Sequence, residues 1–309
     1  MHTFRFTTFA AGALLLISGA ALATPVNLGN AGDYALLAAG TRWNGQTIPG
    51  SMTLGSGARI HGNVGAMSQL ELGAGANVYG NANYGSLTLD PGAGSITGTA
   101  AEQSAAFWAG LRGDLTSASQ AAQSMAGAVD LGAITGNYTF ASTGATSVFD
   151  LTSLNLGAGN SLTLSGHAGD QFIINVANAF NMANASIVLD GISASDVLFN
   201  VYGAYGQSSF TASGGSLQGT FLAPYASMTL GDGITANGAR FLAAGMTANL
   251  QDVYGDFGNG GGGPVPVPEP AALPLLLLGV IGVLALAWRR RKTAADVESQ
   301  EMQRVAQTI

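Results

Sequence analysis

One phrase occurs twice in this chain and limits what it can fold into. "SMTLGSGARIHGNV" at Ser51–Val64 returns, nearly unchanged, as "SMTLGDGITANGAR" at Ser227–Arg240. Weaker copies follow the first one, and their matching leucines, Leu54, Leu72 and Leu89, recur at an almost constant step. Apolar and polar residues alternate within each copy, as in a half-buried strand, and glycine follows where the chain must turn. A strand and turn that repeat at a fixed short step indicate a β-solenoid.

The solenoid predicts which side chains are buried. We expect leucines of successive coils to stack inward, and the Ser and Thr between them to face outward. The same alternation of apolar and polar residues continues, with less regular spacing, at Leu154–Gly166 and Asp196–Gly203. A flat β-sandwich would also give alternation, but would not readily repeat one phrase at a fixed step. We therefore expect the two full copies to occupy equivalent rungs, with several rungs between them.

One segment has helical spacing instead. From Thr99 to about Gly127, apolar residues recur on one helical face. Thr99 and Glu102 have the spacing of a capping box at its start. We expect a long helix lying along the solenoid, with this apolar face: Phe107, Leu111, Leu115, Ala118, Ala122 and Met125.

Composition excludes several classes of function. Only 9% of the 309 residues are charged, the net charge is −7, and there is no cysteine. The chain therefore has no disulfides and no thiolate metal site or cysteine nucleophile. Nucleic acid binding needs clustered cations. Residues 24–263 contain only four basic residues, which are Arg42, Arg59, Arg112 and Arg240. We expect no nucleic acid partner.

The two ends have the composition of targeting segments. Residues 1–23 combine Arg5, an apolar run and the small residues Ala21 and Ala23, as in a secretory signal cut after Ala23; a retained membrane anchor is the alternative. After the expected solenoid domain (24–257) comes a Gly/Pro linker (258–270). The uncharged residues 271–288 would span about 27 Å as a helix, close to the ~30 Å of a bilayer core. Basic residues open the tail 289–309, which we expect to stay cytoplasmic.

This C-terminus resembles the PEP-CTERM sorting signal of Gram-negative exoproteins. The resemblance rests on Pro268, Glu269 and Pro270, the apolar segment, and the basic cluster Arg289, Arg290 and Arg291. It implies recognition by exosortase, a membrane transpeptidase, after anchoring at the inner membrane. It also implies release to the cell surface or an exopolysaccharide matrix. The chain departs from the family pattern because it continues past Lys292 to Ile309. A plain single-span anchor is the alternative.

The central region resembles ice-binding-like β-helix adhesins and choice-of-anchor A domains. "NLGNAGDYALLAAG" near the start, the helix after the first coils, and "GSLQGTFLAPYASMTLGDGITANGARFLA" near the end carry the resemblance. It covers most of Val26–Phe257. It implies an all-β-dominated, right-handed parallel β-solenoid with one long flanking helix, in which the first and last parts of the domain wind into one body.

Signs of catalysis are weak. His61 and His167 stand alone, without a metal-binding motif. The aspartates are dispersed, mostly beside glycine or at strand ends, and no D-x-D-x-D-G run suggests calcium. We expect no catalytic residues, no metal and no cofactor. A polysaccharide-active enzyme remains an alternative, because some β-helix proteins act on polysaccharides.

The outward hydroxyls are the remaining candidates for a site. Stacked coils could align them into a ladder that meets ice or a glycan, although Thr also simply favours strands. The second coil carries Gln69 and Glu71 at the equivalent positions, which interrupts the ladder. We expect a non-enzymatic exported adhesive or structural protein, with ice binding as the alternative. The candidate face is Ser51, Thr53, Ser86, Thr88, Ser161, Thr163, Ser227 and Thr229.

Overall fold

The computed structural model describes residues 26–43, 45–125, 128–204, 206–249 and 252–255. The predicted signal peptide, linker, apolar segment 271–288 and basic tail lie outside these residues. Among the residues described, no helix is long and apolar enough to cross a membrane. The predicted membrane span therefore stays a prediction.

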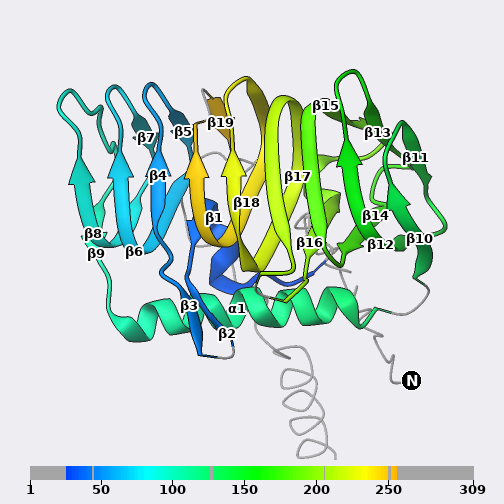
Figure 1. The fold of residues 1–309 in the computed structure, drawn as a ribbon, viewed down its shortest axis with the longest axis horizontal. Helices are drawn as coiled ribbons and strands as arrows, with labels where there is room; N and C mark the ends of the chain where they lie inside the picture. The colour runs from blue at the N-terminus through cyan, green and yellow to red at the C-terminus, as the bar shows by residue number, and fades with distance from the viewer. Residues whose placement is uncertain (1–25, 44, 126–127, 205, 250–251, 256–309) are drawn as a thin grey trace, which may run out of the picture. The chain divides into compact units, whose positions relative to one another are not determined.

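The described chain forms a parallel sheet of 17 strands that winds into a solenoid (Figure 1). The strand pairings fall into three ladders, which define three faces. Face A contains β1 (Tyr34–Ala38), β9 (Ala100–Glu102), β14 (Gln171–Val176) and β16 (Val197–Val201). Face B contains β4 (Met52–Leu54). Face C contains β5 (Arg59–His61), β7 (Asn77–Tyr79), β11 (Tyr138–Ala141), β13 (Ser161–Ser165) and β19 (Asp252–Tyr254).

Longer strands pass from one face to the next. Those that cross from face A to face B are β6 (Asn63–Leu72), β8 (Ala82–Leu89), β10 (Val129–Ile134) and β12 (Thr146–Leu156). β15 (Ala179–Asp190) crosses from face B to face C, and β17 (Ser209–Leu230) and β18 (Ile234–Ala248) extend further around the coil. An antiparallel hairpin, β2 (Thr41–Trp43) and β3 (Gln46–Ile48), is inserted between β1 and β4. The short helix η1 (Gly29–Asp33) precedes β1, and η2 (Ala194–Asp196) lies in the turn between β15 and β16. The predicted parallel solenoid is confirmed, while its sense of winding stays a prediction.

The chain starts in the middle of this coil. It winds from β1 to β9, returns along helix α1 (Ala105–Gln123), and winds again from β10 to β19. β1 then lies between β18 and β6, and β19 pairs with β5, so the two halves form one continuous sheet. The expectation that the first and last parts wind into one body is confirmed.

The two copies of the repeated phrase are closer than predicted. Thr53 and Thr229 each pair with Thr247 of β18, so one strand separates them rather than several rungs. The physical reason is the return path of α1. The helix carries the chain back across the solenoid, and the C-terminal coils therefore finish against the N-terminal ones.

Helix α1 starts later than predicted. Ala100–Glu102 forms strand β9, and the Thr99 backbone N–H donates to Asn81 Oδ1 at 2.8 Å. The proposed Thr99–Glu102 capping box is therefore wrong, because these residues complete the last coil. Ser104 caps the helix instead, with its Oγ accepting from the Phe107 backbone N–H at 3.3 Å.

The predicted apolar face of α1 is largely confirmed. Leu111, Leu115, Ala118 and Ala122 are buried, together with Trp108, which the pattern did not single out. The other two predicted residues, Phe107 and Met125, are partly buried against the same cluster, and Met125 lies just beyond the end of the helix. These side chains cover outward apolar side chains of face A, among them Leu37, Val148, Ile173, Leu198, Leu222 and Leu242. Two buried amides also hold the helix: Asn175 Nδ2 donates to the Ala122 carbonyl and Asn200 Nδ2 to the Ser119 carbonyl, at 3.1 and 3.2 Å. Face A is thus a covered surface.

The core consists of ladders of identical or similar side chains. Met228, Met246, Met52 and Leu70 follow one another in register inside face B. Elsewhere the ladder is aromatic, with Phe199, Phe221 and Phe241 stacked at centroid distances of 5.0 Å. Each fully buried side chain of this size contributes about 1.5–3 kcal/mol. Successive coils therefore hold each other rigidly, and the outward positions above them are fixed in place.

Candidate functional site

A single column of polar side chains follows face B across neighbouring strand segments. Strand pairing places Thr229, Thr247, Thr53, Glu71 and Thr88 side by side. On the other side of Thr229, the column continues through Thr211, one coil earlier in β17, where the Gly231 N–H donates to the Ala212 carbonyl at 2.7 Å. Pairing then extends it to Asn181 and Asn155. We call this the central column: Asn155, Asn181, Thr211, Thr229, Thr247, Thr53, Glu71 and Thr88.

Alternation along the strands makes these side chains point outward. Met52, Leu54, Met228 and Leu230, which flank Thr53 and Thr229, are completely buried. Because successive side chains of a strand leave opposite sides of the sheet, the threonines between them must face solvent. Thr211, Thr229, Thr247 and Thr88 are exposed, and the rest of the column is half-buried.

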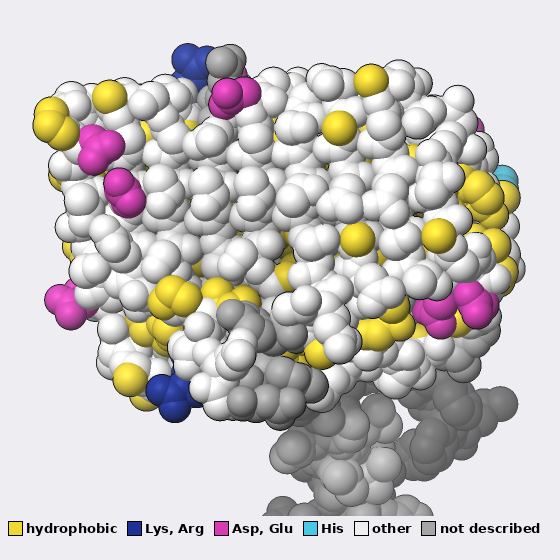
Figure 2. All heavy atoms as spheres, viewed as in Figure 1, with side chains coloured by type: hydrophobic (Ala, Val, Ile, Leu, Met, Phe, Trp, Pro, Cys, Tyr) yellow, Lys and Arg dark blue, Asp and Glu magenta, His cyan; other side chains and the backbone are white. Residues whose placement is uncertain are grey.

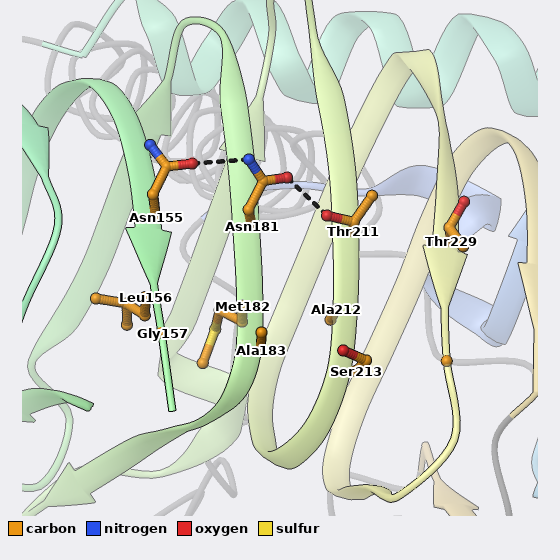
Figure 3. Close-up of a pocket in the computed structure, with 11 residues that line it drawn as sticks. Asn155, Leu156, Gly157, Asn181, Met182, Ala183, Thr211, Ala212, Ser213 and Thr229 are labelled. Carbon is orange, nitrogen blue, oxygen red and sulfur yellow. Dashed lines mark hydrogen bonds between the residues drawn. The ribbon is translucent and has the colours of Figure 1, made fainter. Parts of the chain in front are cut away.

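Hydrogen bonds order the column at its two ends. In Figure 3, Asn181 Nδ2 donates to Asn155 Oδ1 at 2.7 Å and Thr211 Oγ1 donates to Asn181 Oδ1 at 2.6 Å. Toward β8, Thr53 Oγ1 donates to Glu71 Oε2 at 3.3 Å and Gln69 Nε2 donates to Thr88 Oγ1 at 3.0 Å. These bonds run between adjacent strands, so they fix side-chain orientation along the solenoid.

A second outward column lies two positions earlier on the same strands. Strands in a sheet are about 4.8 Å apart, and outward residues of one strand are about 7 Å apart. The two columns therefore form a two-dimensional array, which is interrupted in the second column at Gly245, a buried glycine next to Ile48 of β3. The members of the second column are Ser209, Ser227, Gly245, Ser51, Gln69 and Ser86.

The structure brings together six of the eight predicted hydroxyl residues. Ser51, Thr53, Ser86, Thr88, Ser227 and Thr229 all lie on face B. Ser161 and Thr163 belong to β13, which pairs with β11 and the end of β15, and so lie on face C. The same S-L-T-L phrase occupies a different side of the coil there, because turn lengths in that part differ.

Sequence reasoning missed four members of the central column. Thr211 and Thr247 stand one coil before and one coil after Thr229, but their surrounding phrases "SFTA" and "GMTA" had lost the leucine used for alignment. The step between Leu54 and Leu72, applied in both directions from Thr229, could have found them. Asn155 and Asn181 could not be found this way, because the coils there are longer.

Charge is scarce on face B. This face is turned toward the viewer in Figure 2, where side chains that are neither charged nor hydrophobic cover most of it. Its surface is hollowed over β15 and β17 into a shallow groove of about 410 Å³ (Figure 3). Asn181, Thr211 and Thr229 lie along one side of the groove and Ala183, Ser213 and Gly231 along the other. The face therefore offers hydroxyl and amide groups, and little else.

The two histidines of the described residues lie apart from face B and from each other. His61 is stacked between Tyr79 and Tyr254, at centroid distances of 4.6 and 4.3 Å. His167 lies in an exposed turn, where its backbone N–H holds the pKa of Asp170 below its ordinary value. Within residues 26–255 as described, no three metal-ligating side chains come together. The sorting residues Pro268, Glu269, Pro270 and Arg289–Arg291 lie outside the described residues.

Three solved structures that this chain resembles are those of ice-binding proteins. One from the Antarctic ascomycete Antarctomyces psychrotrophicus is 22% identical, with a TM-score of 0.51 over 74% of this chain and 96% of its own. One from an Antarctic biological consortium is 21% identical (TM-score 0.48, 80% and 95% covered), and one from Arctic yeast is 16% identical (0.48, 81% and 98%). At these identities the first likeness shows the fold alone. No curated protein sequence matches.

Family profiles match both parts of the chain. The ice-binding-like adhesive domain matches residues 8–251, which is most of the chain, and the PEP-CTERM protein-sorting motif matches residues 266–292. The chain therefore belongs to the ice-binding-like adhesive domain family and carries a PEP-CTERM sorting motif behind that domain.

Proposed function

We propose that this protein is a non-enzymatic adhesin, exported to the cell surface, that attaches to ice through face B. The observation that carries the proposal is the run Thr211, Thr229, Thr247 and Thr53, four threonines in register on neighbouring strand segments. The sequence had suggested that Gln69 and Glu71 interrupt such a run. The structure places this interruption toward one end of the column, beyond the four consecutive threonines.

A regular threonine array suits a partner that is itself a regular array. Each hydroxyl both donates and accepts hydrogen bonds, and each methyl group covers apolar surface. The stacked core beneath the strands fixes the spacing before binding, so little conformational entropy is lost on contact. Ice presents repeating rows of oxygen atoms that accept and donate in the same way. The scarcity of charge on this face agrees with such a neutral partner.

The sorting motif supports the cellular side of the proposal. A PEP-CTERM motif marks a chain for export and membrane-associated sorting. We infer that exosortase recognises Pro268-Glu269-Pro270 and that the domain then stays at the cell surface or in its surrounding matrix. Binding of ice by a surface-attached domain would hold the cell at ice.

The test is ice recrystallisation inhibition and ice-affinity partitioning of the full-length chain. Thr247→Tyr places a bulky ring in the middle of the central column and should abolish both activities. Thr235→Tyr is the matched control, because Thr235 is also exposed on β18 but lies beside Asp252 on face C. Equal activity of the two variants, or no partitioning of the unaltered chain into ice, would refute the proposal.

A further inference from the structure

Beside the central column, the β2–β3 hairpin encloses a second groove, and we propose that this groove binds a neutral saccharide chain. The groove has a volume of about 480 Å³ and lies between the hairpin, the segment after residue 205, and the corner of β17 near Tyr225. This is within the range of small-ligand sites in proteins. The groove shares Thr211 and Thr229 with the central column, but the inference goes beyond the ice-binding proposal because it concerns the hairpin wall and a different ligand.

The hairpin is an addition to the coil. Leu36 pairs with Val64 and Val64 pairs with Ala82, so the coil that contains the hairpin is longer than the one that follows it. Ordering this extra length of chain costs conformational entropy. Gly50 has a φ of +71°, and a Cβ there would overlap the backbone nitrogen of Gly40, so the two legs of the hairpin are held tightly together. The hairpin that forms the wall of this groove therefore needs extra chain length and two glycines with constrained backbone, Gly40 and Gly50.

The lining of the groove combines hydroxyls with apolar surface. Thr47 contributes from the hairpin, Ser209 and Thr211 from the start of β17, and Ser227 and Thr229 from its end. Pro49 supplies exposed apolar surface next to the largely buried Ile48, and the half-buried Tyr225 adds an aromatic ring with a hydroxyl, while Phe210 and Ala226 belong to the core beneath. Sugar rings present the same combination, with hydroxyls at their edges and C–H groups on their faces. Hydroxyl side chains that both donate and accept can satisfy sugar hydroxyls without selecting a charge.

The groove is electrically neutral. None of its lining residues is charged, and the same holds for the shallow groove across β15 and β17. Arg42 lies across the hairpin from Thr47 but is not among the lining residues. Acidic or basic polysaccharides would meet no complementary charge here, whereas desolvating their charges would cost free energy. This favours a neutral glycan over a charged one.

The two grooves share Thr211 and Thr229. Together they form a track that begins at the hairpin, crosses the central column, and continues past Ser213 and Gly231. A track of this kind accommodates several linked sugar units rather than a single one. The predicted ligand is therefore a chain of several sugar units.

The experiment uses the full-length chain on an array of immobilised neutral, uronic-acid and amino-sugar oligosaccharides. Thr47→Trp fills the groove from an exposed position of the hairpin, outside both columns. We expect the unaltered chain to bind neutral oligosaccharides, Thr47→Trp to weaken this binding at least about tenfold, and Thr247→Tyr to leave it unchanged, because Thr247 lines neither groove. Thermal unfolding monitored by circular dichroism shows that each variant is folded.

Ice partitioning of the same variants separates the two proposals. Thr247→Tyr should lose ice partitioning and keep oligosaccharide binding, whereas an unaltered chain that partitions into ice but binds no oligosaccharide would fail the saccharide proposal alone. The saccharide proposal is overturned if no neutral oligosaccharide is bound, if charged oligosaccharides are preferred, or if folded Thr47→Trp binds as well as the unaltered chain.

Discussion

Arg59 donates two hydrogen bonds to Asp252, at 2.8 and 3.1 Å, across 193 positions of sequence. This pair joins β5, from the first half of the solenoid, to β19, from the last. Directly beside it, Ile60 pairs with Val253 in the core, and His61 stacks on Tyr254 outside. The seam between the two halves is thus closed by an ion pair, an apolar pair and a ring pair.

The apolar pair should dominate the stability of this seam. Ile60 is completely buried, so Ile60→Ala should lower the free energy of unfolding by about 2–5 kcal/mol. The ion pair is exposed on both sides and screened by solvent, so Arg59→Ala should cost much less than Ile60→Ala. Urea unfolding of the two variants measures both. A larger loss for Arg59→Ala would contradict this ranking.

Acid should remove the contribution of the ion pair. Hydrogen bonding to Arg59 lowers the pKa of Asp252 below its ordinary value. A carboxyl whose pKa is lower in the folded chain stabilises the fold above the unfolded-state pKa of about 3.9, and loses this effect as pH falls through the folded-state value. The difference in urea midpoint between the unaltered chain and Asp252→Asn should therefore be present at neutral pH and vanish in strong acid. In an Arg59→Gln background the difference should be small at every pH.

The start of α1 can be tested by its cap. Ser104→Ala removes the oxygen that accepts from the Phe107 N–H and should cost about 0.5–2 kcal/mol. Thr99→Ala should change stability by less than about 0.5 kcal/mol, because Thr99 contributes its backbone N–H rather than its side chain to Asn81. Urea midpoints that rank the two in the opposite order would place the cap at Thr99 after all.

Ice binding through face B should increase when a threonine is added to the central column, just as it should fall when one is replaced. Glu71→Thr removes the carboxylate within the central column and extends the run of threonines through Thr53 to Thr88. We expect recrystallisation to be inhibited at a lower protein concentration than with the unaltered chain. Glu102→Thr, in β9 and away from the column, removes the same charge and should have no effect. Improvement in both variants would attribute the gain to charge alone.

Sorting should depend on the PEP triplet. With Pro268, Glu269 and Pro270 replaced by alanine, recognition by exosortase should fail and the chain should accumulate in the membrane fraction. Cell fractionation followed by immunoblotting measures this. An unchanged distribution between membrane, surface and medium would mean that the PEP triplet does not direct sorting of this chain.

The sequence predicts what depends on local period. Alternation at Met52–Leu54 and Met228–Leu230 is enough to give strands with a buried leucine row, and the helical spacing from Leu111 to Ala122 is enough to give the helix and its buried face. Both patterns concern neighbours along the chain, where periodicity reports directly on burial.

Features that depend on long-range pairing were missed. Thr99–Glu102 looks like a helix cap, yet pairing of β9 with β8 determines its structure. Ser161 and Thr163 carry the right phrase on the wrong face, because the side of the coil depends on turn lengths before them. Thr247 joins the central column only because the last coils return to meet the first, which no local pattern reveals.

The position of β19 determines how the fold resists a mechanical force applied at Gly255, where its described part ends. β19 is hydrogen-bonded on one side to β18 and on the other to β5, and Gly255 still donates to the His61 carbonyl. Tension applied at Gly255 must shear two rows of hydrogen bonds at once, whereas a strand at the end of the coil would peel away from a single neighbour. A force applied there would therefore act on the seam, where the sheet is hydrogen-bonded on both sides, rather than on a strand at the end of the coil.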